Sequence, residues 1–154
     1  MRIAGIDADT KSIQIVVLDG VTPVIQRIEA AGRRSEDRIQ ALAEGFENTQ
    51  QIWGDVRWVY VESPIMGVNV KSLRDQAQVL GIIRSYLWRH GLDHSLVDNG
   101  TWKKGILGNG HASKEEITAY AQSVLIVPSG LPQDAYDAAC IAAWGFNNVP
   151  QEVS

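Results

Sequence analysis

The sequence contains a single cysteine, Cys140, and no long run of apolar residues. One cysteine cannot close an intrachain disulfide or supply a thiolate zinc site, which favours a reducing compartment. A membrane-spanning helix needs about 18 consecutive apolar residues, and no stretch approaches that length. Asp7 and Asp9 lie where a secretory signal would be apolar. We therefore expect a cytoplasmic protein with no membrane partner.

Internal repeats, linkers and low-complexity segments are also missing from the sequence. The chain has 154 residues, of which 45% are hydrophobic and 21% charged. This length and composition are typical of one globular domain and exclude collagen, coiled coils and disordered chains. We expect a single domain over residues 1–154.

An excess of positive charge is missing as well. The sequence has fourteen Lys and Arg residues and eighteen Asp and Glu residues, for a net charge of −4. Binding of a polyanion through an overall positive field is therefore not indicated. The segment 71–104 is locally basic, with six bases against three acids. A solvated helix face explains this segment as readily as a nucleic-acid contact does.

Hydrophobic patterning predicts a mixed α/β fold. Three β-rich runs, 2–8, 12–18 and 22–28, are separated by turn residues and predict an antiparallel meander. Later runs predict helices over 34–51, 70–90, 113–125 and 133–144 and strands over 57–62 and 94–97. Ser35 is the expected N-cap of the first helix. We expect a mixed five-stranded sheet, with three antiparallel strands followed by parallel ones and helices on both faces, a layout that fits the ribonuclease H-like fold among others.

Four acidic residues lie where these elements begin or end. Asp7 and Glu62 come near the ends of two predicted strands, and Asp134 and Asp137 share one face of the last helix. Such a cluster repels itself unless hard cations bind, and magnesium or manganese suits an oxygen ligand set. Two such ions promote in-line attack of water on a phosphodiester bond.

Each acid also has a simpler explanation. Asp7 could be a turn residue, Glu62 an exposed strand end, Asp134 an N-cap and Asp137 a first-turn acid favoured by the helix dipole. Asp9 and Asp98 are weaker candidates for the site, because Asp9 is better explained as a turn residue and Asp98 as a strand end. The coincidence of acids in three separate elements favours a common site.

Four blocks of sequence carry a resemblance to a known family. They are Gly5-Ile6-Asp7; Val61-Glu62 with Met66 and Asn69; Lys103-Lys104 before Gly108-Asn109-Gly110 and Lys114; and Asp134-Ala135-x-Asp137-Ala138-Ala139. Together, in order and at family-like spacing, they resemble the RuvC-type Holliday junction resolvases. The resemblance spans residue 3 to about residue 145.

The resemblance implies a homodimeric endonuclease, dependent on Mg²⁺ or Mn²⁺, that makes paired symmetric nicks in a four-way DNA junction. It implies two ions per active site and no nucleotide cofactor. Asp7, Glu62, Asp134 and Asp137 match the catalytic, metal-binding tetrad. Lys103 and Lys114 match basic residues near the scissile phosphate, and Lys104 adjoins them in the same block. Asn69 lies in the segment that approaches the junction.

Two departures from the family pattern mark a divergent member, with bacteriophage origin as one interpretation. Ala8-Asp9 replaces the usual Pro-Gly after the first aspartate, which adds a fifth carboxylate. Ile65 replaces an aromatic wedge that many members carry, and an isoleucine can unstack a base step but loses aromatic stacking. Relaxed specificity for forks, flaps and other branched DNA is therefore an open alternative.

Lys114 is unusual on physical grounds alone. Ser113 and Glu116 predict a capping box, which places Lys114 in the first helical turn, where the helix dipole disfavours a cation. A bound phosphate would reverse that preference. A solvated lysine offset by Glu115 is the alternative.

Two other classes of protein are alternatives to a nuclease. The opening segment, residues 5–20, also resembles the first phosphate segment of actin and sugar-kinase ATPases, but those proteins need a second comparable domain. A non-catalytic nucleic-acid-binding relative would be expected to lack a carboxylate, and none of the four is missing.

The predicted helix over 70–90 is the expected dimer surface. Ala77 and Gly81 are small enough for close approach of a second chain. Val79, Ile82 and Tyr86 lie off its main apolar stripe, and we expect a monomer to leave them exposed.

Overall fold

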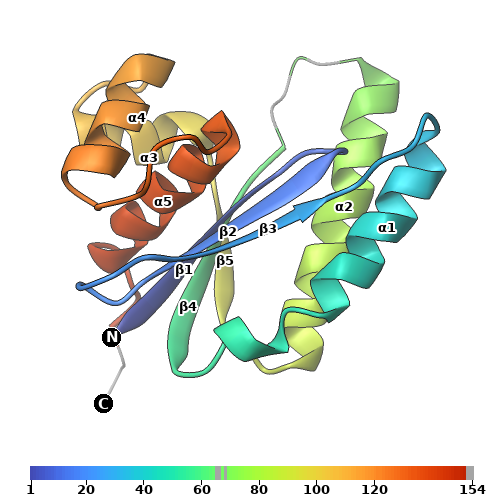
Figure 1. Ribbon diagram of the computed structural model, residues 1–154, viewed down its shortest axis with the longest axis horizontal. Helices are drawn as coiled ribbons and strands as arrows, with labels where there is room; N and C mark the ends of the chain where they lie inside the picture. The colour runs from blue at the N-terminus through green and yellow to red at the C-terminus, as the bar shows by residue number, and fades with distance from the viewer. Residues whose placement is uncertain (65–66, 68, 152–154) are drawn as a thin grey trace.

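A five-stranded mixed sheet forms the middle of the molecule in the computed structural model, which describes residues 1–64, 67 and 69–151 (Figure 1). The strands are β1 (Arg2–Ala8), β2 (Ser12–Leu18), β3 (Val24–Glu29), β4 (Val56–Glu62) and β5 (His94–Val97). They lie in the order β3-β2-β1-β4-β5. The β1–β2 and β2–β3 pairs are antiparallel, whereas β1–β4 and β4–β5 are parallel. This arrangement confirms the predicted ribonuclease H-like fold.

Helices cover both faces of the sheet. The helices α1 (Ser35–Glu47) and α2 (Val70–Arg89) lie on one face. The other face carries α3 (Asn99–Leu107), α4 (Lys114–Ser123) and α5 (Gln133–Phe146) (Figure 1). A 3₁₀ turn, Gln50–Ile52, follows α1. Each face of the sheet has its own apolar core. Within the described ranges, no helix is long and apolar enough to cross a membrane.

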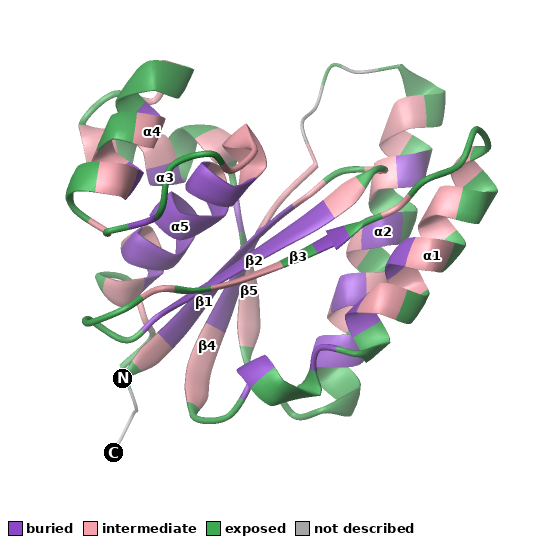
Figure 2. Cartoon of the chain, viewed as in Figure 1, coloured by how far each residue is buried: buried purple, intermediate pink, exposed green. Residues whose placement is uncertain are grey.

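Helix α5 is the most deeply buried helix and packs directly on β1 and β2 (Figure 2). Alanines fill much of its length, and their small side chains let its backbone approach the sheet. The approach is closest at Gly5, where an added Cβ would lie 2.2 Å from the Ala138 carbonyl oxygen and 2.5 Å from the Ala142 nitrogen. Gly5 is therefore required by the close packing of α5 on β1.

Several local predictions hold. Ser113 caps α4, since its Oγ accepts a hydrogen bond from the Glu116 N–H at 3.2 Å. Gly91 follows the last turn of α2 with a φ of 65°, the left-handed conformation expected at a helix end. Asp19 accepts hydrogen bonds from the N–H groups of Val21 and Thr22 in the turn between β2 and β3.

Other local predictions are wrong. The N-cap of α1 is Arg34, which makes no side-chain capping bond, and Ser35 is the first helical residue. The first helix ends at Glu47 instead of residue 51, because the chain turns into the 3₁₀ segment there. Helix α3 was not predicted, because its segment contains Gly100 and Gly105 and offers only one large buried anchor, Trp102.

The expectation for the surface of α2 is also wrong in part. Val79 and Tyr86 are each 1% exposed and belong to the core beneath α1 and α2. A monomer therefore already buries both residues, and Ile82 is half-buried. The cause is α1, which packs along α2 and widens the buried stripe.

Candidate active site

The four predicted acids converge on one cleft of about 320 Å³. Asp7 lies near the C-terminal end of β1, and Glu62 is the last residue of β4. Because β1 and β4 are parallel, these ends meet at one edge of the sheet. Asp134 and Asp137 reach the same cleft from the first turns of α5. The arrangement agrees with the common site expected from the sequence.

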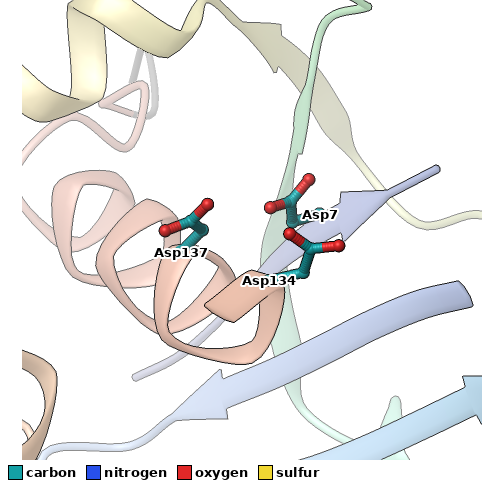
Figure 3. A group of neighbouring side chains, drawn as sticks. All are labelled: Asp7, Asp134 and Asp137. Carbon is teal, nitrogen blue, oxygen red and sulfur yellow. The ribbon is translucent and has the colours of Figure 1, made fainter. Parts of the chain in front are cut away.

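Three of the acids form a compact group between β1 and α5 (Figure 3). Carboxylate oxygens of Asp7, Asp134 and Asp137 lie within 4.8 Å of one another. Asp7 is only 7% exposed. Glu62 lines the cleft beside them, outside this closest group. An all-oxygen donor set of this kind fits a hard divalent cation.

Burial and mutual repulsion raise the pKa values of these acids. Burial is the main cause for Asp7, whose pKa is raised well above its ordinary value, and Glu62, Asp134 and Asp137 add to the rise. Protonated Asp7 donates a hydrogen bond to Asp137. Burial, with Asp9 and Asp137 nearby, raises the pKa of Asp134 to about 6. Without a cation the cluster therefore retains protons that a bound ion would displace.

Helix α3 holds Glu62 in place. The Trp102 Nε1 donates to Glu62 Oε2 at 2.6 Å, and the Asn99 Nδ2 donates to the same oxygen at 3.3 Å. Both hydrogen bonds lower the pKa of Glu62, although burial raises it overall. Neither bond engages Oε1. Trp102 is fully buried, so it is a core residue and does not stack on a base.

A third supporting bond comes from α5 itself. The Gln133 Nε2 donates to Asp137 Oδ1 at 3.1 Å, one turn apart on the same helix. Sequence reasoning missed Asn99, Trp102 and Gln133. The only available signals were the position of Asn99 just after β5, the Trp102-Lys103 pair and the four-residue spacing of Gln133 and Asp137.

Two of the three predicted lysines line the cleft. Lys103 comes from α3 and Lys114 from the first turn of α4, and the charges of both lower the pKa of Asp137. Lys104 is exposed and is not part of the cleft lining. The lysines at the cleft place positive charge beside the carboxylates, where a phosphate would approach.

The remaining predicted contacts lie at the edge of the site or beyond it. Asn69 is exposed and caps α2, with its Oδ1 accepting from the Ser72 N–H at 2.9 Å. Ile65 lies outside the described residues. The simpler explanation of Asp134 as an N-cap is wrong, since Pro132 occupies that position. Asp98 takes the N-cap position of α3 without a side-chain capping bond.

Asp9 combines the two roles considered for it. Its Oδ1 accepts from the N–H groups of Lys11 and Ser12 at 2.7 and 2.8 Å, which makes it a turn residue. It also lines the cleft and raises the pKa of Asp134. A fifth carboxylate therefore lines the cleft.

Comparisons with known proteins find similarity to one family. The family model described as "Crossover junction endodeoxyribonuclease RuvC" matches residues 4–144. A protein of that description from Saccharopolyspora erythraea is 27% identical over 149 residues, covering 92% of this chain and 75% of the relative. Another from Synechocystis is 28% identical over 96 residues, covering 62% of this chain and 57% of the relative.

Solved structures show the same fold. Thermus thermophilus RuvC has a TM-score of 0.76 at 17% identity, covering 96% of both chains. RuvC from the same organism in complex with a Holliday junction substrate has a TM-score of 0.78 at 19% identity, covering 95% of this chain and 93% of that one. The yeast mitochondrial Holliday junction resolvase Ydc2 has a TM-score of 0.57 at 11% identity, covering 92% and 76%.

Proposed function

The chain belongs to the RuvC family of crossover junction endodeoxyribonucleases, and we propose that it resolves four-way DNA junctions by metal-dependent hydrolysis at the acidic cleft. The observation that carries the proposal is the convergence of Asp7, Asp134 and Asp137, with carboxylate oxygens within 4.8 Å, beside Lys103 and Lys114. The bacterial relatives support a site of action in the cytoplasm of a bacterium or of a bacteriophage host.

The residues of the cleft have different roles in this reaction. Asp7, Glu62, Asp134 and Asp137 would hold one or two Mg²⁺ or Mn²⁺ ions, which when bound activate water and stabilise the leaving oxygen. Asn99 and Trp102 fix Glu62, and Gln133 fixes Asp137, so the carboxylates are oriented before a cation arrives. Lys103 and Lys114 bind the phosphate that the carboxylates would otherwise repel.

Paired symmetric nicks require two such sites related by a two-fold axis, so we propose a homodimer. The supporting feature is α2, on which Ala77 and Gly81 are exposed. Gly81, Ile82 and Ser85 line a groove of about 430 Å³ against Ala43 and Glu47 of α1. A second chain could approach closely there.

A panel of labelled substrates tests the proposed activity. Four-way junction, fork, flap and linear duplex are incubated with the protein and Mg²⁺, and the strands are resolved on a denaturing gel. We expect paired nicks at symmetric positions in the junction. Equal cleavage of forks and flaps would indicate the relaxed branched-DNA nuclease, and binding without cleavage would indicate the non-catalytic relative.

The matched control is Asp7→Asn, which removes a charge with little change of volume. We expect cleavage to fall by orders of magnitude, since a carboxylate ligand is lost. Junction binding should survive or improve, because the repulsion of phosphate decreases. A gel-shift titration on the same junction measures binding. Near wild-type turnover of Asp7→Asn would contradict the assignment of the site.

A further inference from the structure

The face of β2 that packs beneath α5 contains a polar side chain with an unpaired oxygen. Gln14 is 1% exposed, and its Oε1 has no hydrogen-bond partner among the described residues. The residues two and four positions further along the strand on this face, Val16 and Leu18, are apolar and pack in the core beneath α5. Burying an acceptor without a donor destabilises a fold, so an apolar residue would suit this position better.

The register of the sheet places Gln14 beside the acidic cluster. Gln14 pairs directly with Asp7 across the β1–β2 ladder. Side chains of directly paired residues project from the same face with Cβ atoms about 5 Å apart. The next residue along the same row, on β3, is Arg27, whose guanidinium binds Glu29. Gln14 therefore lies between the carboxylate of Asp7 and an arginine that is already paired.

The groups around the cluster do not provide the donor that Oε1 lacks. When Asp7 and Asp134 are ionised, as a bound cation requires, their carboxylates only accept hydrogen bonds. A hydrated divalent cation supplies what is missing, because Mg²⁺ usually keeps several waters and each metal-bound water is a donor. The unpaired Oε1 of Gln14 could therefore accept a hydrogen bond from water on an ion held at Asp7.

We propose that Gln14 is a positioning residue for the metal site, whose side-chain carbonyl oxygen accepts a hydrogen bond from water bound to the cation at Asp7. This inference rests on the proposed function, because it assumes that the cluster holds a divalent ion. It adds a sixth element of the site, β2, to the five that supply Asp7, Glu62, Asp134, Asp137 and the cleft lysines. It also explains why an amide occupies an otherwise apolar core face.

Mn²⁺ binding to the DNA-free protein tests the proposal without reference to cleavage. Free Mn²⁺ is followed by its electron paramagnetic resonance signal during titration of metal-free wild type, Gln14→Leu, Gln14→Met and Gln14→Glu. Loss of an outer-shell partner of a metal site typically lowers affinity about 10- to 100-fold, which is the loss we expect for the Leu and Met variants. Gln14→Glu keeps an acceptor oxygen at the same distance and should bind at least as tightly as wild type.

A stability measurement separates this role from a structural one. We expect the melting temperature of metal-free Gln14→Leu to equal or exceed that of wild type, since the unpaired oxygen is gone. Arg27→Leu, in the same row but one strand further from Asp7, is the matched control and should leave Mn²⁺ affinity unchanged.

Two results would overturn the inference. Unchanged Mn²⁺ affinity in both Gln14→Leu and Gln14→Met would make Gln14 a structural residue only. Loss of affinity in Gln14→Glu would show that the amide donates to Asp7, against the acceptor role proposed. A wild-type protein that binds Mn²⁺ and cuts junctions, with Gln14 variants that behave like wild type, removes this inference but leaves the proposed function intact.

Discussion

At the scale of single residues, the carboxylates of the cleft differ in their burial and in their hydrogen-bond partners. Asp7 is buried among other acids and shares a hydrogen bond with Asp137. Glu62 is fixed by two donors from α3. Asp134 is half-buried, and the charges of Asp9 and Asp137 both raise its pKa. Charge repulsion is therefore greatest in the metal-free protein, and it depends on pH.

The pH dependence of stability should reveal the raised pKa of Asp134. Its pKa is raised from 3.8 to about 6 in the folded protein. The native state then binds this proton more tightly than the unfolded chain, so the contribution of Asp134 to stability falls as pH rises from about 4 to 6. In EDTA, the melting temperature of Asp134→Asn should rise relative to wild type across this range, as followed by circular dichroism.

Added Mg²⁺ provides the complementary observation. A cation that binds the ionised cluster of the native state stabilises it, so the wild-type melting temperature should rise most above about pH 6. Asp134→Asn should respond less. A constant difference in melting temperature between wild type and Asp134→Asn at all pH values would contradict the raised pKa of Asp134.

The two cleft lysines should act differently from their exposed neighbour. Lys103→Ala and Lys114→Ala should each lower cleavage and reduce the slope of log binding constant against log salt by about one, if each lysine contacts one phosphate. Lys104→Ala should change the slope but leave the rate at saturating junction near wild type, because Lys104 lies outside the cleft lining. An equal loss of rate in all three variants would contradict this division.

At the scale of elements, α5 carries two of the acids, and Gly5 controls its distance from β1. The motif Gly5-Ile6-Asp7 combines the close contact with α5 and one of the cleft acids. Gly5 allows the helix backbone to approach β1, and Asp7 lines the cleft with the acids from the first turns of α5. Packing of the element thus sets the geometry of the site.

Gly5→Ala should disturb fold and site together. The added methyl would meet backbone atoms of α5, which cannot rotate away, so we expect a loss of about 2 kcal/mol or more in the free energy of unfolding. Urea denaturation measures the loss. Gly100→Ala, in helix α3 with open space around the added Cβ, is the control and should be neutral or slightly stabilising. Equal stability of the two variants would contradict the packing argument.

Elements with strong local patterns could be predicted, and those defined by tertiary contacts could not. The strands and α2 followed from apolar runs and periodicity, and the four acids from their places at element ends. Helix α3 has two glycines and one buried anchor, so its propensity is weak, and packing against α5 stabilises it. The hydrogen bonds from Asn99 and Trp102 to Glu62 join residues 37 and 40 positions apart, which no local pattern encodes.

At the scale of the whole molecule, the exposed side of α2 is the expected contact with a second chain. Val79 and Tyr86 do not belong to this surface, since both are buried within one chain. The small exposed residues Ala77 and Gly81 remain, together with the groove beside Ile82.

Gly81→Glu tests the dimer without disturbing the monomer. Nothing lies within 4 Å of a Cβ added at Gly81, and replacing glycine inside a helix should stabilise the chain by about 0.5–1 kcal/mol. Light scattering should give about twice 16.9 kDa for wild type and 16.9 kDa for the variant. The variant should also bind junctions poorly. A wild-type protein that is monomeric yet makes paired nicks would contradict the dimer.

The position of α5 as the final helix has a consequence during translation. Asp134 is synthesised about 127 residues after Asp7, an interval of roughly 6–25 s at typical rates of synthesis. Until then the nascent chain lacks two of its four acids and the helix that covers β1. If the proposed site is correct, we expect a chain interrupted before residue 133 to be unable to cut junctions, because it lacks Asp134 and Asp137.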